Sequence, residues 1–318
     1  MRAPYIESVR NRGNLFSGLF ERPPHCITPG ATMPRVSVLM PAYNSEKYIA
    51  TAIESILNQT FSDFEFIIIN DGSTDNTAKI VRQYARRDPR IKFVDNKKNR
   101  GISETRNSLL DMATGEYAAY QDSDDVSMPN RLAQQVKFLD SNPEISVVGA
   151  AMQAFPIARL IKCPTQPRIL DFYFANAVSN PTAMMRMRDI KSAGLRYDTD
   201  LSTAEDYDFW FNVIKRFNIY NLPDVLVNYR VLPASLSHNN PKLDECNAKI
   251  RGKILNFLAS DEAIRTNLAP TRRLYLFGVL PIFKLKRTRI YLFEIIPLFK
   301  RRGRWWWLFD VFPFITQR

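Results

Sequence analysis

Apolar and polar positions along residues 35–122 alternate between a strand period and a helix period. The run RVSVLMPAYN (35–44) is apolar and rich in β-branched residues, which predicts a buried strand followed by a loop. Residues 45–60 carry apolar pairs at helical spacing, which predicts a helix with Ser45 as its N-cap. The plan continues with strands predicted at the start of 64–77, at 91–97 and at 116–122, and with helices predicted through AKIVRQYARR and at 103–113.

This alternation predicts an α/β fold with a mostly parallel sheet and helices on both faces, because parallel neighbours are joined by helical crossovers. In such sheets, ligands bind beyond the carboxyl ends of the strands. Pro41, Asp71 and Asp122 each fall at such an end. We therefore expect polar residues from three separate loops to converge on one crevice.

Charge divides the chain of 318 residues into three predicted parts. Residues 1–33 hold 4 basic and 2 acidic side chains, residues 34–264 hold 28 of each, and residues 265–318 hold 12 and 2. The middle part is therefore interpreted as an electrically balanced globular domain, and a hydrophobic content of 45% suffices for its core. The basic excess of the last part indicates a partner of opposite sign, either anionic lipid or nucleic acid.

The first part, residues 1–33, is expected to be an irregular extension. RPPHCITPGATM is rich in residues that interrupt helices and strands, and NLFSGLF is too short for a signal-peptide core. Met33 directly precedes the first strand and is either the natural start or the end of a loose extension. Cys26, Cys163 and Cys246 lie far apart in no ligand spacing, which favours a reducing compartment.

The last part, residues 265–318, is predicted to be a basic, aromatic and helical tail in the interface of an anionic membrane. Its apolar runs, 274–283 and 290–299, are ten residues each, about half of what a spanning helix needs. Lys and Arg flank these runs, and Trp305 to Trp307 suit the headgroup level. The alternative is an ordinary helical cap on the middle domain. No nucleic acid partner is expected, since nothing else resembles a nucleic-acid reader.

Three carboxylates follow the predicted strand at 116–122: Asp122, Asp124 and Asp125. Like charges this close raise one another's pKa, so a cation, an arginine or water is expected beside them. Residues i and i+2 of an extended segment share a face. Asp122 and Asp124 could therefore present two oxygens to Mg²⁺ or Mn²⁺, although a solvated acidic loop has the same spacing. Asp125 could instead cap the turn that follows.

Other acidic residues have an ordinary structural explanation beside a functional one. Asp71 could accept a hydrogen bond from a nucleobase, or form an Asx-turn into a helix whose expected N-cap is Asp75. Glu205, Asp206 and Asp208 precede an aromatic helix, where acidic side chains commonly complement the helix dipole.

Common nucleotide and zinc motifs are missing from the sequence. There is no P-loop, no Gly-x-Gly-x-x-Gly and no His/Cys cluster with zinc spacing. The histidines are His25 and His238. His238 is a weak candidate for a metal or diphosphate contact, and a solvent-exposed loop histidine is the simpler interpretation.

Three segments are informative through their order along the chain. They are VSVLMPAYNSEKYIATAIESILNQTFSDFEFIIINDGSTDNT, then GISETRNSLLDMATGEYAAYQDSDD, then EDYDFWFNV. From about Val36 to about Tyr229, the chain closely resembles the family 2 glycosyltransferases. The resemblance implies a GT-A fold and an inverting transfer of a hexose or N-acetylhexosamine from a UDP-sugar. It also implies a hydroxyl of a glycan or lipid-linked acceptor, in surface polysaccharide synthesis.

The resemblance also assigns roles to individual positions. In the family, the Asp of the second strand end binds uracil, the Pro-x-Tyr after the first strand lines the nucleotide pocket, and an Arg-Asn pair lies beside it. The nucleotide-sugar residues implied here are Pro41, Tyr43, Asp71, Arg106 with Asn107, Asp122 and Ser123. The D-x-D motif implies Asp122 and Asp124 as ligands of Mg²⁺ or Mn²⁺, and the Glu-Asp pair implies Asp206 as the general base.

Two departures from the family narrow the expectation. Processive members carry Gln-x-x-Arg-Trp after the base, and this string is missing, so one sugar per visit is expected. No long apolar helices flank the domain, so no built-in export channel is expected. The expected location is the cytoplasm, peripheral on the inner face of the cell membrane.

Two other functions remain as alternatives. A sugar-nucleotidyltransferase should carry a glycine-rich loop after the first strand, and MPAYNSEKY has no glycine. A non-catalytic membrane-associated scaffold would use the basic tail but leaves the carboxylates at strand ends unexplained.

Overall fold

The computed structural model describes residues 33–232, 241–258 and 260, together with the backbone of six strands between residues 272 and 316. The strands of the first part are β1 Val36–Ala42, β2 Phe64–Asn70, β3 Ile91–Asp95, β4 Tyr117–Tyr120, β5 Val126–Ser127, β6 Ile145–Phe155, β7 Arg159–Ile161, β8 Met184–Arg186 and β9 Asn218–Arg230. The helices are α1 Ile49–Leu57, α2 Thr77–Ala85, α3 Ile102–Met112, α4 Arg131–Ser141, α5 Ile169–Phe174, α6 Met187–Ser192, α7 Glu205–Ile214 and α8 Pro241–Leu258, with a 3₁₀ turn at η1 Asn180–Thr182.

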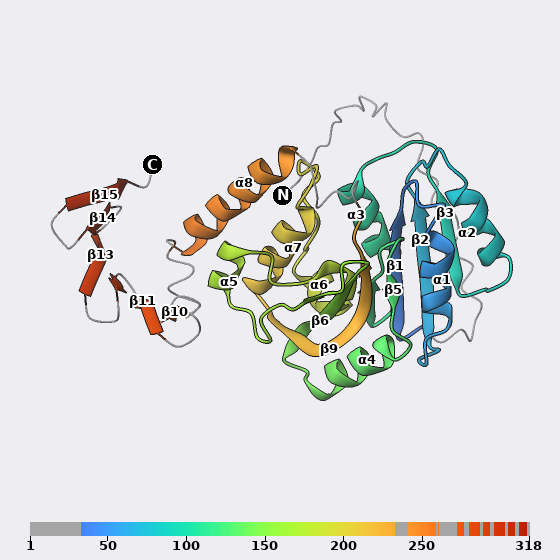
Figure 1. Ribbon diagram of the computed structural model, residues 1–318, viewed down its shortest axis with the longest axis horizontal. Helices are drawn as coiled ribbons and strands as arrows, with labels where there is room; N and C mark the ends of the chain where they lie inside the picture. Colours follow the sequence, from blue (N-terminus) through green and yellow to red (C-terminus); the bar gives the residue numbers. More distant parts are fainter. Residues whose placement is uncertain are drawn as a thin grey trace, which may run out of the picture. The chain divides into compact units, whose positions relative to one another are not determined.

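The first half of this part is the predicted parallel sheet. Strands β3, β2, β1 and β4 lie side by side in that order, each parallel to its neighbour, and α1, α2 and α3 connect them (Figure 1). The alternation of strands and helices predicted for residues 35–122 is thus confirmed. Parallel order places the carboxyl ends of β1, β2 and β4 at one edge, where the predicted site residues begin.

The second half extends this sheet with mixed directions. Strand β8 runs antiparallel to both β4 and β6, while β9 pairs parallel with β6 and antiparallel with β5. The result is one nine-stranded sheet in the order β3-β2-β1-β4-β8-β6-β9-β5, with β7 paired to β6. The predicted α/β class with a mostly parallel sheet is therefore confirmed.

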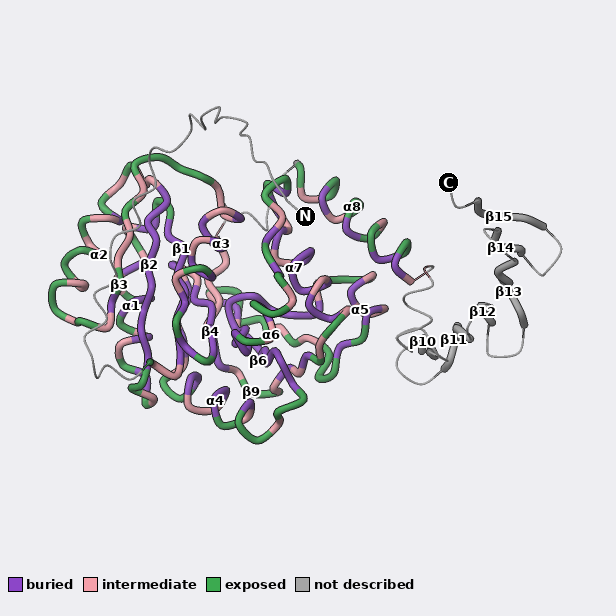
Figure 2. Tube along the Cα trace, turned by 180° about the vertical axis from the view of Figure 1, so that it is seen from behind, coloured by how far each residue is buried: buried purple, intermediate pink, exposed green. Residues whose placement is uncertain are grey.

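The sheet separates two apolar cores, and its central strands are buried on both sides (Figure 2). Along β1, Val38 and Met40 pack with residues of α1, α2 and α4, whereas Leu39 packs with residues of α3, α7 and α8. Successive side chains of a strand point to opposite faces, so an uninterrupted apolar run serves both cores.

The start of α1 differs from the prediction. The helix begins at Ile49, and its first turn has no side-chain cap. The backbone oxygen of Ser45 accepts hydrogen bonds from the N–H groups of Tyr48 and Ile49, both at 2.9 Å. The Ser45 hydroxyl lies 2.6 Å from the hydroxyl of Ser123 instead. Ser45 therefore joins two loops at the carboxyl edge of the sheet rather than capping the helix.

The backbone described between residues 272 and 316 is extended, not helical as predicted. It forms β10 Arg272–Leu276, β11 Leu280–Lys286, β12 Arg289–Leu292, β13 Ile296–Arg302, β14 Trp305–Leu308 and β15 Phe312–Thr316, an antiparallel sheet in chain order. Pro281, Pro297 and Pro313 each lie inside a strand, and a proline in a helix interior would remove a hydrogen bond and clash with the preceding turn. The predictions for residues 1–32 and for a domain boundary at 264 lie outside the described residues.

Candidate active site

A buried arginine joins two of the predicted acidic motifs. Arg106 comes from α3, and its guanidinium pairs with Glu205 at the start of α7. A second nitrogen lies 3.8 Å from Oδ1 of Asp122, just after β4. The side chains of Arg106 and Glu205 are only 8% and 7% exposed. Residues 122 and 205 therefore belong to one charged network although 83 positions separate them.

The surroundings of Arg106 keep it charged. Burial by itself lowers its pKa, but Glu205, Tyr197, Asp122 and Asp206 outweigh burial and raise it. The guanidinium carbon also lies 5.5 Å from the ring centroid of Tyr197. Arg106 is thus a fixed positive charge inside the site. The neighbouring Asn107 exchanges two hydrogen bonds of 2.9 Å with the backbone of Tyr197, which anchors α3 to that loop.

Asp206 lies at the start of α7 and has the electrostatics of a general base. Burial, then the neighbouring Glu205 carboxylate, raises its pKa to about 7. Its Oδ1 accepts from the backbone N–H of Tyr207 at 2.8 Å, and its Oδ2 accepts from the amide of Asn176 at 3.1 Å. A carboxyl that titrates near neutral pH is well matched to accept a proton during a reaction.

The backbone of Ala204 helps to fix this position. Ala204 precedes α7 in the left-handed region, with φ at +57°. A residue with a Cβ pays a steric cost there, which persists only where the surroundings hold it. After this turn, Glu205 is buried and pairs with Arg106, whereas Asp206 is partly exposed.

The D-x-D segment carries more negative charge than its protein surroundings neutralise. Burial raises the pKa of Asp122, whose side chain is still 26% exposed. Burial and the nearby Asp122 raise the pKa of Asp124 to about 6. Burial, then Asp122 and Asp124, raises the pKa of Asp125 well above its usual value, and its Oδ2 has no hydrogen-bond partner. A bound dication would relieve this repulsion.

The prediction that Asp125 caps the following turn is wrong. Asp125 is fully buried, and its Oδ1 accepts from the backbone N–H of Arg230 at 2.8 Å. The Arg230 side chain in turn donates to the backbone oxygen of Asp124 at 3.0 Å. Asp125 therefore ties the D-x-D loop to the end of β9, while Asp122 and Asp124 remain for other partners.

Asp71 lies where the sequence predicted, at the end of β2, but most of its oxygen lone pairs are engaged. It is 4% exposed and accepts from the backbone N–H groups of Arg100 and Gly101, both at 3.0 Å, and from the amide of Asn96 at 3.1 Å. Asp71 thus holds the loop before α3. Gly72 follows at φ +71°, where a Cβ would meet the backbone of the same loop at 2.5 Å.

The loop after β1 presents Tyr43 to solvent. Tyr43 is 50% exposed, whereas Pro41 is buried within β1, opposite Ile69 of β2, rather than after the strand. Asn44 accepts a hydrogen bond of 2.9 Å from the backbone of Thr74. This bond links the loop after β1 to the loop after β2.

Three other predicted residues have defined places. Ser123 is buried with its hydroxyl against Ser45. Asp75 accepts from the backbone N–H groups of Glu46 and Thr77, at 3.0 and 2.9 Å, although α2 starts at Thr77 and Asn76 is its N-cap. Asp208 is buried and accepts from Lys253 of α8 at 2.7 Å, so it is structural. His238 lies outside the described residues.

Two asparagines were not predicted. Asn176 follows α5 and donates to Asp206, and Asn180 in η1 is 4% exposed with neither side-chain atom hydrogen-bonded. Single asparagines in a loop carry no spacing signal, and Asn176 is 30 residues from its partner. Pro181 and the small residues around these two asparagines indicate only a turn.

The oxygen atoms of the D-x-D segment fit a divalent cation whose coordination shell is completed by water and substrate. Among the described residues, no group of three or more His, Cys, Asp or Glu side chains is arranged to hold a metal. Mg²⁺, however, commonly takes one or two carboxylates and completes its shell with water and substrate phosphates. Asp122 and Asp124 supply that number of carboxylates.

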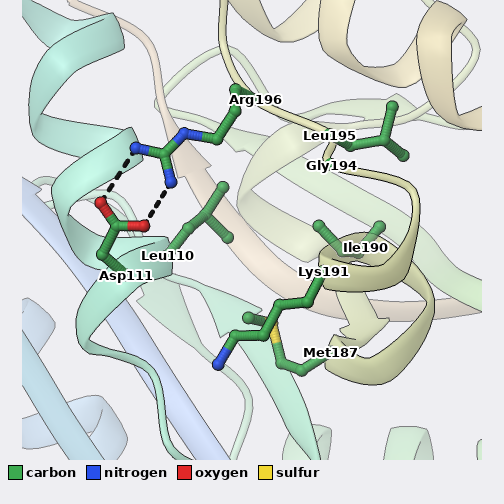
Figure 3. Close-up of a pocket in the computed structure, with 8 residues that line it drawn as sticks. All are labelled: Leu110, Asp111, Met187, Ile190, Lys191, Gly194, Leu195 and Arg196. Atoms are coloured by element: carbon green, nitrogen blue, oxygen red, sulfur yellow. Dashed lines mark hydrogen bonds and ion pairs between the residues drawn. The ribbon is translucent and has the colours of Figure 1, made fainter. Parts of the chain in front are cut away.

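The structure also contains a small cavity with a different lining (Figure 3). It has a volume of about 150 Å³ and is lined by Leu110, Asp111, Met187, Ile190, Lys191, Gly194, Leu195 and Arg196. Asp111 and Arg196 close one side of it through a two-fold ion pair. None of the predicted site residues lines this cavity.

Comparisons with known proteins give the family of the chain. The family model described as "Glycosyl transferase family 2" matches residues 37–192. The putative glycosyltransferase EpsE of Bacillus subtilis is 37% identical over 205 residues, which cover 62% of this chain and 73% of EpsE. The chain is a family 2 glycosyltransferase. The matched residues contain all of β1 but its first residue, the D-x-D segment and Arg106, so the resemblance predicted from sequence is confirmed.

A named relative and a solved structure are each similar to this glycosyltransferase over about two thirds of its length. The UDP-Glc:alpha-D-GlcNAc-diphosphoundecaprenol beta-1,3-glucosyltransferase WfgD of Escherichia coli is 31% identical over 228 residues, 65% of this chain and 81% of WfgD. The structure of Staphylococcus aureus TarS 1-349 in complex with UDP has a TM-score of 0.55 and 25% identity, and the match covers 70% of this chain and 71% of that one. The GT-A fold is thereby confirmed.

Proposed function

We propose that this glycosyltransferase moves one hexose or N-acetylhexosamine from a UDP-sugar to a hydroxyl of a glycan or lipid-linked acceptor, with inversion, in surface polysaccharide synthesis. One observation carries the proposal. Asp206, with a pKa near 7, is linked through Glu205 and Arg106 to Asp122 of the D-x-D segment. A direct displacement requires that the base and the diphosphate-binding segment keep fixed positions relative to each other.

Asp206 is the general base in this proposal. Its carboxylate takes the proton of the acceptor hydroxyl while the hydroxyl oxygen bonds to C1 of the sugar from the face opposite the diphosphate. The bond between C1 and the diphosphate oxygen breaks, and UDP leaves with that electron pair. Help from a well-placed base contributes roughly 10²–10⁴ in rate. Asn176 keeps Oδ2 of Asp206 in place during the transfer.

The D-x-D segment holds the metal in this proposal. Asp122 and Asp124 are the ligands, and Mg²⁺ or Mn²⁺ bound there would neutralise charge on the departing diphosphate. Arg106 keeps Asp122 oriented from the side away from solvent, because its guanidinium is fixed by Glu205. Asp125 anchors the segment to β9, because its carboxylate accepts a hydrogen bond from the backbone N–H of Arg230. His238 remains a weak candidate for a further metal contact.

The loops after β1 and β2 form the nucleotide side of the proposed site. The exposed ring of Tyr43 offers a stacking surface for uracil. Pro41 lies in β1, two residues before Tyr43, and is paired with Ile69 of β2. Asp71 acts on uracil partly through the loop that it anchors at Arg100 and Gly101. Ser123, locked against Ser45, fixes the loop that carries the ribose and metal contacts.

Two similar proteins support UDP as the nucleotide. TarS was solved in complex with UDP, and the name of WfgD specifies UDP-glucose and a diphosphoundecaprenol-linked acceptor. Similarity to a teichuronic acid biosynthesis protein, TuaG of Bacillus subtilis, supports a place in surface polysaccharide synthesis.

The side-chain amide of Asn180 has no hydrogen-bond partner. We propose that it forms a hydrogen bond with a hydroxyl of the donor or acceptor sugar. One sugar per visit is part of the proposal, since the processive motif is missing.

The proposed location is peripheral, on the cytoplasmic face of the cell membrane, with the basic tail against anionic lipid and without a nucleic acid partner. Among the described residues, no helix has both the length and the apolar character needed to cross a bilayer. Similarity to WfgD, named for a lipid-linked acceptor, supports a membrane setting.

A panel of UDP-sugars tests the proposal. Release of UDP would be followed with Mn²⁺ or Mg²⁺ and with lipid extracts or soluble glycans as acceptors. One UDP-sugar should give acceptor-dependent release, and excess chelator should abolish it. Release from no member of the panel, with binding of another nucleotide in its place, would overturn the assignment of UDP.

A further inference from the structure

The end of the chain contains a sequence repeat with a period of 16 residues. Leu-Phe recurs at 276–277, 292–293 and 308–309, preceded each time by an aromatic residue, and a proline recurs at 281, 297 and 313. The apolar halves align as LYLFGVLPIF, IYLFEIIPLF and WWLFDVFPFI. We call residues 274–289, 290–305 and 306–318 units 1, 2 and 3. A fixed period of this kind indicates one structural element used repeatedly.

The backbone repeats with the same period. Tyr275 pairs with Pro281, Tyr291 with Pro297, and Trp307 with Pro313. A register shift occurs at the same position of each unit, between 274 and 275, between 290 and 291, and between 306 and 307. Sequence and backbone register thus agree that the tail is three copies of one two-stranded unit.

Some of the cations of the repeat lie opposite one another in the register of the strands. Residues 272–318 contain eleven Lys or Arg but only two acidic residues, Glu294 and Asp310. Lys286 lies opposite Arg289, and Arg289 lies opposite Lys300 on its other side. Like charges directly opposite one another destabilise a sheet. An anionic partner at this row would offset such repulsion.

The cations also lie mostly at one end of the strands. They occupy the start of β10 and β12 and the end of β11 and β13. Because neighbouring strands are antiparallel, the start of one lies beside the end of the next. The acidic residues Glu294 and Asp310 follow the other ends of β12 and β14 in sequence. The cations of the described strands are therefore concentrated at one end of these strands.

We propose that units 1 to 3 form a multivalent docking surface for an anionic phospholipid bilayer. Unit 1 contributes Lys284, Lys286, Arg287 and Arg289, and unit 2 contributes Lys300, Arg301, Arg302 and Arg304. The two units are equivalent in number of cations, so each supplies an equal share of the binding. The inference deepens the proposed peripheral location, but it is independent of which sugar is transferred.

The composition of the units favours lipid over nucleic acid. Units 1 and 2 each couple four cations to an aromatic, mostly apolar run of ten residues, such as 274–283 in unit 1, and unit 3 contributes a run of the same kind, 306–315. Short apolar runs flanked by cations, with Trp and Tyr, are typical of segments that lie in the membrane interface. Nucleic-acid surfaces are more polar and do not require such runs.

The test is sedimentation of the full chain with vesicles of phosphatidylcholine mixed with phosphatidylglycerol, compared with phosphatidylcholine alone. Four cations of unit 1 are changed together to Gln, and separately the four of unit 2. Each variant should lose partitioning on the order of a hundredfold, because each basic residue at an anionic surface contributes several-fold. The two losses should be equal within a few-fold, and high salt should remove binding of the unchanged chain.

A matched control changes four cations of the first part of the chain. Lys79, Arg86, Arg87 and Lys137 are exposed and lie outside the candidate active site. Changing these four to Gln should leave partitioning unchanged. A second variant, with Lys284, Lys286 and Lys300 changed to Arg, retains the charge and should bind as the unchanged chain does. It separates loss of charge from loss of folding.

UDP release in solution, measured on the same variants, keeps this inference separate from the proposed function. Release should be unaffected by the changes in units 1 and 2. If no UDP-sugar supports release, the proposed function fails, and the vesicle result still decides the docking surface. Equal loss in the Lys79 control, unchanged binding in both unit variants, or preference for RNA or DNA over anionic vesicles would overturn the inference.

Discussion

The side-chain amide of Asn176 donates a hydrogen bond of 3.1 Å to Oδ2 of Asp206. The other oxygen of Asp206 accepts from the backbone N–H of Tyr207. Both oxygens of the proposed base are therefore held by donors, one from the loop after α5 and one from α7. Donors stabilise the charged form of a carboxylate. Asn176 thus limits how far burial can raise the pKa of Asp206.

Replacing Asn176 should shift the pH dependence of transfer. In Asn176→Ala the carboxylate loses a donor, so the pKa of Asp206 rises further and the acidic limb of the kcat/KM profile moves up by about one pH unit. Asn212→Ala is the matched control, since its amide donates at 2.9 Å to Asp208, which is not part of the proposed chemistry. A shift in both variants, or in neither, would contradict the positioning role of Asn176.

The unchanged enzyme should lose activity as pH falls through about 7, the pKa to which burial and Glu205 raise Asp206. Below that value the carboxyl is protonated and cannot take the hydroxyl proton, so kcat/KM should fall about tenfold for each pH unit. The measurement needs saturating metal, because the pKa of Asp124, raised to about 6, affects metal binding in the same range. An acidic limb near the ordinary carboxyl pKa of about 4 would contradict the assignment.

Breaking the Arg106 network should be costly. Arg106→Gln leaves Glu205 buried without its partner, which should reduce the free energy of unfolding by about 3–5 kcal/mol. Arg196→Gln removes the ion pair between Arg196 and Asp111, two side chains that are each about half exposed. This change should reduce the free energy of unfolding by about 1 kcal/mol or less. Chemical denaturation of both variants compares them directly. Equal stabilities would show that the buried network contributes nothing beyond a surface pair.

Asp124→Ala should abolish metal-dependent transfer without unfolding the chain, since Asp124 is partly exposed and belongs to neither core. Its pKa is raised in the folded state, so the folded chain holds the proton more tightly, and stability falls as pH rises from about 4 to about 6. Removing Asp124 should flatten that fall in a thermal melt. Added Mn²⁺ should stabilise the unchanged chain near neutral pH and stabilise the variant less. Full activity of the variant in excess chelator would exclude the metal role.

Hydrophobic periodicity predicted the first four strands because each is a short apolar run bounded by turn residues and followed by a helix pattern. It did not predict that β8 would be inserted antiparallel between β4 and β6. Strand β8 is only Met184–Arg186, and three residues show no period. Its place depends on pairing with residues of β4 and β6 that lie up to 69 and 38 positions away in sequence. Long-range pairing of this kind is not encoded in a local pattern.

Motif spacing singled out acidic residues as candidates, but it did not predict the contacts that hold them. Arg106 was expected beside a nucleotide, and the structure adds that its guanidinium pairs with Glu205 and approaches Asp122. Asp125 was considered as a cap of the turn that follows it, whereas its carboxylate accepts from the backbone N–H of Arg230, 105 residues away. In the tail, apolar runs of ten residues allow either helix or strand, and the prolines inside them decide against the predicted helices.

The most direct test of the proposed mechanism is transfer by Asp206→Asn. The amide has nearly the same shape but cannot accept the proton, so UDP-sugar affinity should remain within a few-fold while kcat falls by roughly 10²–10⁴. Asp208→Asn, two positions along the same helix and paired with Lys253, is the control and should reduce stability more than kcat. Loss of UDP-sugar affinity together with kcat in Asp206→Asn, or transfer at the unchanged rate, would contradict the account.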